Sequence, residues 1–396
     1  MHADGAPSDS IGQRIARARK RRALTQHGLA DRSNYSRSHI AQVEAGHKVA
    51  TPAFIAAAAA ALAVDPAELY GQPFRGDTAR EDRVHAAIPE IRRALAYVDV
   101  APDLDAPPRS LDDLTAALAT AHRLQRDARH TQLGARLPAV LEELTFHAYE
   151  TEDSRTWSLL NRAHAVAVSL TRRLGYNDLA NQILERAAVS AARSQDPHLP
   201  LLVAMPRALL MMNVAAWGPA LKLLQRAADA VDHDRADAAE VFGALRMRAA
   251  IVSARAGEKN QAWDYYREAV ETSERSGRAN LDRHGTNFVP GNIAIHGAAV
   301  AVELKDFDEA VRREPKAEVM AALNRERRAH HLVDMARVHV EINDRERALS
   351  RLLTAEKTAP QMTRYHPMAR AVAAHLGNAY RDLPETLRGL LSRMHV

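Results

Sequence analysis

The sequence predicts an all-α protein with a small five-helix unit at its N-terminus and a long array of helix pairs behind it. Three observations support this prediction. Capping residues divide residues 11–70 into five short helices. Beyond residue 81, the aromatic and β-branched alternation that strands require is absent. In that longer part, a pattern of small residue, large apolar residue and alanine recurs at intervals of roughly 40 residues.

Start and stop signals mark the five N-terminal helices. Residues 11–22 place Ile11, Ile15 and Ala18 on one helical face. Thr25 and Ser36 precede the second and third helices, where such side chains act as N-caps. The other boundaries carry residues that favour turns or helix starts: Asn34, Gly46, Thr51-Pro52 and Asp65-Pro66, with the fifth helix ending at Tyr70. The expected core residues are Ile15, Leu29, Ala30, Ile40, Val43 and Leu62.

The longer part is expected to be a tetratricopeptide-like α-solenoid over residues 86–396. It follows an N-terminal domain of residues 1–72 and a polar linker of residues 73–85. Helix breaks are expected at residues 101–108, 196–200 and 284–290 and at Pro360. The repeat occurs at Ala180/Leu184/Ala187, Ala220/Leu224/Ala227, Ala262/Tyr266/Ala269 and Ala348/Leu352/Ala355, with a degenerate copy at Ala310. Small residues at fixed positions let stacked helices approach closely. The alternative is an irregular helical bundle in which the alanines recur by chance.

Charge is concentrated near the N-terminus. Residues 11–48 hold nine Lys or Arg and two acidic residues, a net +7, whereas the whole chain carries +5. This distribution is typical of a nucleic-acid-binding head on a neutral body, although a solvated helix face would also explain it. The chain has no cysteine, and its longest apolar run, residues 53–64, is too short to span a bilayer. We therefore expect a cytoplasmic, nucleoid-associated protein without membrane contact.

The segment from Leu24 to Gly46 resembles the XRE (Cro-like, lambda-repressor-like) helix-turn-helix family. It has Thr25-Gln26 at the start of the second helix, Ala30 within it, Ser36 before the third helix, and Ile40-x-x-Val43-Glu44-x-Gly46 at the end of the third helix. Asn34 replaces the turn glycine of the family, and Gly28 stands where a polar residue is common. The resemblance covers about 60 residues and implies double-stranded DNA as the partner, bound as a homodimer on a palindromic operator.

The resemblance also implies roles for individual residues. Base contacts are expected from the third helix in the major groove, through Arg37, Ser38 and Gln42. Arg37 could instead contact a phosphate. Phosphate contacts are expected from Gln26, Ser36, His39, His47, Lys48, Arg14 and Arg17. The family's structural ion pair corresponds to Arg19 and Glu44.

The longer part is similar to the C-terminal region of actinomycete regulators that couple such a head to a tetratricopeptide-like body. The resemblance rests on residues 286–296, 332–339, 344–360 and 365–367, within a span of about 150–380. It implies a sensory or dimerising body, and the layout is also similar to that of peptide-responsive receptors. We expect an effector site, for a peptide or small molecule, at Asn280, His284, Asn287, Asn292 and His296, since amides can pair with a peptide backbone. Alternatively, these residues cap helices and order the loop.

Enzyme motifs are absent: the chain holds no Gly-x-Gly-x-x-Gly, phosphate loop or His-Glu-x-x-His. His330 and Asp334 are four residues apart, but two ligands do not complete a metal site. We expect no enzymatic activity, cofactor or metal. The sequence thus predicts a dimeric transcriptional regulator controlled by a peptide, small-molecule or protein ligand. The alternative is an interaction scaffold, or an antitoxin, whose head mainly localises a protein partner.

Overall fold

The computed structural model describes residues 9–75, 82–97, 100–276 and 282–396, and within them every regular element is helical. We call residues 9–75 the head and residues 82–396 the body. The head consists of α1 (Ile11–Arg21), α2 (Gln26–Ser33), α3 (Arg37–Glu44), α4 (Pro52–Leu62) and α5 (Pro66–Tyr70). These bounds lie within about one residue of the five helices expected from the capping signals, and the all-α prediction is confirmed.

The body begins with the 3-10 helix η1 (Arg83–His85) and continues as helices throughout. The first group is α7 (Ala87–Ala94), α8 (Leu111–Arg126), α9 (His130–Gly134) and α10 (Leu137–Thr151). Five pairs follow: α11 (Ser154–Arg173) with α12 (Asn177–Arg193), α13 (Leu199–Asn213) with α14 (Trp217–Asp229), α15 (Ala238–Ala256) with α16 (Lys259–Ser276), α17 (Pro290–Glu303) with α18 (Phe307–Arg312), and α20 (Arg325–Glu341) with α21 (Arg345–Thr358). The remaining helices are α19 (Ala317–Ala322), α22 (Pro360–Tyr365), α23 (Pro367–Ala379) and α24 (Glu385–Met394).

The alanine repeat marks the second helix of each pair. Its four full copies lie on α12, α14, α16 and α21, and the degenerate copy at Ala310 lies on α18. All of these repeat residues are buried. The turns within the pairs also share one feature, a residue in the left-handed region: Gly175, Ala215, Gly257, Lys305 and Asn343. The expected stack of helix pairs is therefore present.

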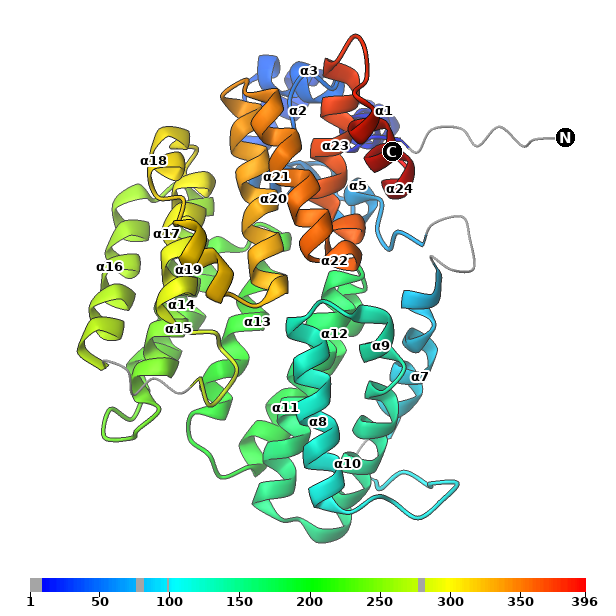
Figure 1. The fold of residues 1–396 in the computed structure, drawn as a ribbon, viewed down its shortest axis with the longest axis vertical. Helices are drawn as coiled ribbons and strands as arrows, with labels where there is room; N and C mark the ends of the chain where they lie inside the picture. Colours follow the sequence, from blue (N-terminus) through cyan, green and yellow to red (C-terminus); the bar gives the residue numbers. More distant parts are fainter. Residues whose placement is uncertain (1–8, 76–81, 98–99, 277–281) are drawn as a thin grey trace, which may run out of the picture.

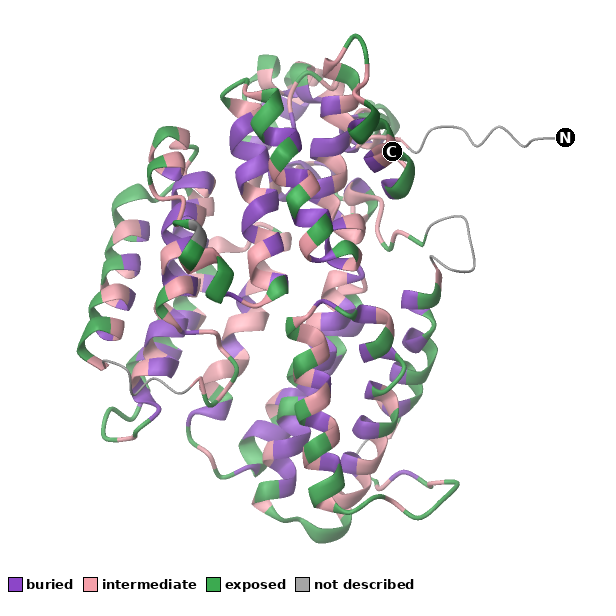
Figure 2. Cartoon of the chain, viewed as in Figure 1, coloured by how far each residue is buried: buried purple, intermediate pink, exposed green. Residues whose placement is uncertain are grey.

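The array curves so that the chain returns to its own beginning (Figure 1), and its buried residues line the inner sides of the helices (Figure 2). The head lies beside α20–α24 near the C-terminus. Its core residues, among them Ile15, Ile40 and Phe54, belong to the same apolar cluster as Val333, Leu352 and Leu376 of the body. Burial of apolar surface thus holds the head against the body in this structure.

The expected linker is tied to the body at its two described ends. The Arg370 guanidinium lies over the Phe74 ring, 3.5 Å from the ring centre. His85 shares a 2.8 Å hydrogen bond with the carbonyl oxygen of Phe74, and its other ring nitrogen lies 3.1 Å from the Tyr176 hydroxyl. No helix among the described residues is both long and apolar enough to cross a bilayer.

Candidate functional site

Local capping sets the geometry of α2 and α3. The Thr25 hydroxyl accepts a hydrogen bond from the backbone N–H of Gly28, 3.0 Å away, and Ser36 does the same for His39 at 3.2 Å. Asn34 adopts φ = 57° between the two helices. Its left-handed conformation turns the chain sharply, as a glycine would. The two short helices are thus joined by a tight turn.

Arg19 and Glu44, the expected structural pair, lie together in the structure and connect α1 to α3. Arg19 Nε lies 2.7 Å from Glu44 Oε1 and Arg19 Nη2 lies 2.8 Å from Oε2, a two-point contact. Gln26 adds a third hydrogen bond to the same carboxylate at 2.9 Å. Burial works against ionisation of Glu44, but the hydrogen bonds from Arg19 and Gln26 outweigh it and hold the pKa of Glu44 below its ordinary value. The amide of Gln26, expected at a phosphate, is thus used within the head.

The outer face of α3 carries the residues expected to contact bases. Arg37, Ser38 and Gln42 are exposed, whereas Ile40 and Val43 on the opposite face are buried. Among the described residues, Arg37 has no carboxylate at ion-pairing distance. Its guanidinium donors are therefore free to bind an external acceptor.

The other residues expected at phosphates fall into two groups. Arg14 and Lys48 are already engaged: Arg14 donates to the carbonyl oxygens of Leu69 and Tyr70 at 2.9 and 3.0 Å, and Lys48 lies 3.5 Å from Glu341 of the body. The Arg14 contacts satisfy the last carbonyls of α5, a structural role. Arg17 is exposed and pairs with Asp9, and Ser36 and His47 are also exposed.

His39 is packed between aromatic rings. Its ring centre lies 5.1 Å from that of Tyr35 and 4.8 Å from that of Phe54. Burial, with smaller contributions from Lys48 and Lys305, lowers the pKa of His39 to about 4. The ring is therefore neutral near pH 7, which weakens it as a phosphate partner.

Residues 10–69 match the profile of the family described as "Helix-turn-helix domain". The N-terminal segment is a helix-turn-helix domain. The match adds to the cap–turn–cap geometry and the exposed face of α3. No curated protein matches the chain significantly.

Two solved structures show a distant likeness. BtubC (BKLC) from P. vanneervenii is 17% identical, with coverage of 69% of this chain and 95% of that one. PlcR from Bacillus thuringiensis, solved with the peptide PapR7 and DNA, is 13% identical, with coverage of 85% and 98%. Both have a TM-score of 0.38, which is too low to support a conclusion about fold or ligand.

A groove separates the helix-turn-helix domain from the body next to α3. It measures about 680 Å³ and is bordered by Gln42, His47 and Lys48 on one side and by Glu341 and His375 on the other. His375 Nδ1 lies 3.2 Å from the Gly46 carbonyl oxygen. No local pattern in the sequence indicates these contacts, because the residues that they join are more than 290 positions apart. For that reason, the sequence did not identify Glu341 and His375 as residues of this groove.

A second cavity, with a volume of about 460 Å³, lies inside the curve of the body. Most of its wall comes from the first helices of the pairs: α11, α13, α15, α17 and α20. Four of the five residues expected at an effector site line it: His284, Asn287, Asn292 and His296. The fifth, Asn280, lies outside the described residues.

The amides of this group are largely used within the protein. Asn292 Nδ2 donates to the Asn287 carbonyl oxygen at 2.7 Å, and Asn292 Oδ1 accepts from Arg327 Nε at 2.9 Å. Asn324 Nδ2 donates to Asn287 Oδ1 at 2.9 Å. His296 Nδ1 lies 2.8 Å from the Asn292 carbonyl oxygen. These bonds favour the alternative role, in which the residues order the loop before α17.

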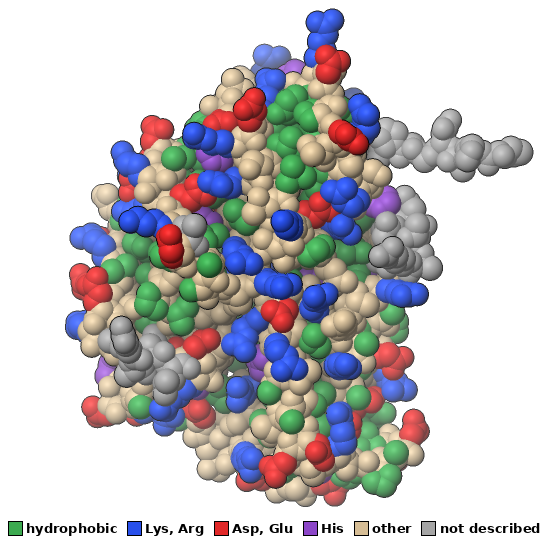
Figure 3. All heavy atoms as spheres, viewed as in Figure 1, with side chains coloured by type: hydrophobic (Ala, Val, Ile, Leu, Met, Phe, Trp, Pro, Cys, Tyr) green, Lys and Arg blue, Asp and Glu red, His purple; other side chains and the backbone are tan. Residues whose placement is uncertain are grey.

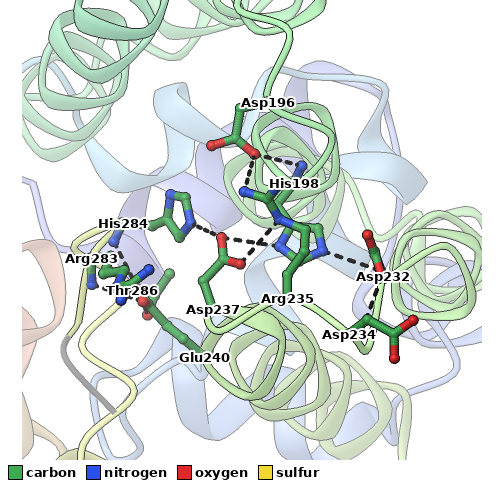
Figure 4. A network of polar contacts seen from close by, with 10 residues as sticks. All are labelled: Asp196, His198, Asp232, Asp234, Arg235, Asp237, Glu240, Arg283, His284 and Thr286. Carbon is green, nitrogen blue, oxygen red and sulfur yellow. Dashed lines mark hydrogen bonds and ion pairs between the residues drawn. The ribbon is translucent and has the colours of Figure 1, made fainter. Parts of the chain in front are cut away.

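His284, which lines the cavity, belongs to a polar network (Figure 4). Its Nε2 lies 2.7 Å from Asp237 Oδ2, and the same carboxylate lies 3.1 Å from His198 Nδ1 and 3.2 Å from Arg235 Nε. Glu240 accepts hydrogen bonds from the backbone N–H groups of Arg283 and His284 at 2.8 and 3.0 Å. The network fixes the loop that leads into α17.

Three groups of this network have the spacing of metal ligands. One ligand atom each from Asp196, Asp237 and His284 lies within 4.8 Å of the others. Arg235 contacts both carboxylates, at 3.4 and 3.2 Å. The guanidinium already supplies the positive charge that a cation would bring, so the geometry fits an ion-paired support better than a metal centre.

Proposed function

We propose that the protein is a sequence-specific DNA-binding transcriptional regulator that acts in the cytoplasm beside the chromosome. The observation that carries the proposal is the outer face of α3, where Arg37, Ser38 and Gln42 are exposed within a helix-turn-helix domain. Such a helix enters the major groove, where arginine pairs with guanine and glutamine with adenine. The net charge of +7 over residues 11–48 attracts the DNA backbone.

The phosphate contacts that we propose are fewer than the sequence suggests. His47 and Arg17 are the strongest candidates, because both are exposed: His47 follows the end of α3, and Arg17 lies on α1, where it pairs with Asp9. Lys48 becomes a third candidate when its ion pair with Glu341 breaks. Arg14, Gln26 and His39 are better explained as parts of the domain's internal structure.

We further propose that the protein binds as a homodimer to a palindromic operator, and that a ligand in the body cavity controls it. Half-sites for such a dimer lie about 34 Å apart, one helical turn. The cavity supports ligand control because its wall includes Pro52, Tyr70 and Gln72 of the N-terminal segment as well as body residues. A ligand there would contact both parts and so bias their relative position.

The test is a binding-site selection with the full chain, followed by measured affinity for the selected sequence. We expect a palindromic motif bound by a species that light scattering shows to be a dimer. Arg37→Ala should weaken that binding by about 1–3 kcal/mol and relax the preference at one base pair in each half-site. Arg325→Ala, a change at an exposed arginine on α20, should have no effect. Selection without a motif would instead support a scaffold that follows a protein partner.

A further inference from the structure

The cavity wall carries more positive than negative charge. Its three acidic side chains include Glu303, which lies 3.3 Å from Arg255 and 3.6 Å from Arg337, and Glu326, which pairs with Arg173. The third, Asp334, has its pKa raised to about 6, mainly by burial. The acids of the wall are thus either paired or partly protonated near neutral pH.

Besides the exposed Arg162, three partly buried arginines face the same space without an ion-pairing carboxylate among the described residues. Arg172 on α11, Arg248 on α15 and Arg327 on α20 line the cavity, and none has a carboxylate at ion-pairing distance within the described ranges. Arg248 Nε is buried and has no hydrogen-bond partner there. Burial, and then the neighbouring guanidinium groups, lower the pKa of both Arg172 and Arg248 to about 9. Three like charges held together in a cavity are costly unless an anion neutralises them.

The neighbouring wall is apolar and incompletely covered. Four apolar side chains of α13 line the cavity and are only partly buried: Leu202, Val203, Met205 and Leu209. A pocket with apolar walls and a few convergent polar groups is the usual form of a small-molecule site. Figure 3 shows Lys and Arg side chains gathered across the middle of the face shown.

We propose that the cavity binds an amphipathic organic anion, with its anionic group on Arg172, Arg248 and Arg327 and its apolar part along α13. This assignment rests on the proposed ligand control of the body and specifies the chemistry of the ligand. Guanidinium groups suit planar oxyanions because they donate two parallel hydrogen bonds. A small acid and the C-terminal carboxylate of an apolar peptide would present the same group.

Tyr70 gives the site a route to the helix-turn-helix domain. Its side chain lines the cavity from the end of α5, in the field of Arg255, Glu303 and Arg337, and burial raises its pKa to about 12. An anion on the arginines would change the electrostatic surroundings of this hydroxyl. Binding in the body would therefore alter the electrostatic environment at the end of α5, the last helix of the head.

The test uses two fluorescent probes that differ in one charged group. 1-Anilinonaphthalene-8-sulfonate carries a sulfonate, and N-phenyl-1-naphthylamine is its neutral counterpart. We expect saturable binding of one sulfonate probe per chain, displaced by decanoate but not by decanol. Arg248→Met should weaken the sulfonate probe about tenfold, the loss expected for a charge-assisted contact, and should leave the neutral probe within about twofold.

Two controls keep the result interpretable. Arg226→Met, at an exposed arginine on α14 outside the cavity wall, should bind both probes like the natural chain. Arg248→Met should not melt at a lower temperature, because it removes one of several mutually repelling charges. If it does unfold, Arg327→Gln provides the same comparison while keeping a donor toward Asn292.

The outcomes separate the inference from the proposed function. Equal affinity for the two probes, or sulfonate binding that Arg248→Met and Arg327→Gln leave unchanged, would overturn the anion site even if the operator is bound. Anion binding by a chain that selects no DNA motif would leave the site standing and overturn the regulator. Apolar tripeptides with a free or an amidated C-terminus then distinguish the sources. Displacement of the sulfonate probe by the free-acid tripeptide at lower concentrations than decanoate, with none by the amide, indicates a peptide carboxylate. Displacement by decanoate and by neither tripeptide indicates a small acid.

Discussion

Two glycines of the N-terminal segment are in opposite steric situations. A Cβ atom at Gly12 of α1 would lie 2.0 Å from the Val43 carbonyl oxygen of α3, so this residue must be glycine for the helices to approach. At Gly28 of α2, a Cβ would lie 3.5 Å from the nearest atom, Leu24 Cδ2, which is an ordinary contact. Gly12 is needed for the close packing of α1 on α3, whereas Gly28 lowers the stability of α2 and no close contact requires a glycine there.

The same substitution should therefore have opposite effects at the two sites. Gly28→Ala should raise the free energy of unfolding by about 1 kcal/mol, because alanine loses less backbone entropy in a helix. Gly12→Ala should lower it by about 1–3 kcal/mol through overpacking. Urea denaturation of the two variants beside the natural chain measures both. A loss of stability in Gly28→Ala would show that α2 is not held as described.

At the level of elements, the loop before α17 and the start of α20 are joined by a chain of side-chain hydrogen bonds. It runs from Asn287 through Asn292 to Arg327, with Asn324 bonded to Asn287. Asn292 is buried, so each bond that it loses leaves a polar atom without a partner. The group is built as a support for the cavity wall.

Asn292→Ala should accordingly destabilise the body by about 1–3 kcal/mol, because it leaves the Asn287 carbonyl oxygen and Arg327 Nε without the hydrogen bonds that Asn292 makes. The midpoint of thermal unfolding, followed by circular dichroism, measures the effect. Asn260→Ala, on the exposed start of α16, is the matched control and should leave the midpoint unchanged. An Asn292→Ala protein of full stability that no longer responds to its effector would restore the peptide-contact role expected from the sequence.

At the scale of the whole molecule, buried histidines couple stability to pH. Burial, with a smaller effect of nearby arginines, lowers the pKa of His122, His130 and His331 to about 4 in each case. In the unfolded chain these groups titrate near 6.5. Between about pH 6.5 and 4, the unfolded chain therefore binds protons that the folded protein excludes.

Stability should be full above about pH 6.5 and should fall as the pH drops toward 4. Each excluded proton contributes a slope of ~1.4 kcal/mol per pH unit. Thermal midpoints at pH 7.5, 6.5 and 5.5 measure this, in a range where most carboxylates remain ionised. His331→Leu should reduce the slope, and His27→Leu, on the exposed surface of α2, is the control. A midpoint independent of pH over this range would contradict the burial of these rings.

The sequence by itself determined the elements whose causes are local. Caps at Thr25, Ser36 and Thr51 and the turn at Asn34 placed the N-terminal helices, because capping depends on side chains within three residues of the backbone they bind. The alanine repeat predicted the paired helices of the body for a similar reason, since each pair packs mainly on its neighbours in sequence. Helical periodicity places Ile40 and Val43 on the buried face of α3, whereas the base-contacting roles of its exposed residues were implied by the family resemblance.

Only the tertiary structure decided where the helix-turn-helix domain lies and what the cavity contains. The contact of Lys48 with Glu341, and the meeting of Arg172, Arg248 and Arg327 from three separate helices, join residues that no local pattern relates. Which charged side chains remain unpaired depends on distances set by the curvature of the whole array. The roles of Arg14 and Asn292 also depend on partners brought close by folding, because a hydrogen-bonding side chain has the same local sequence signature whether its acceptor is a ligand or a distant carbonyl.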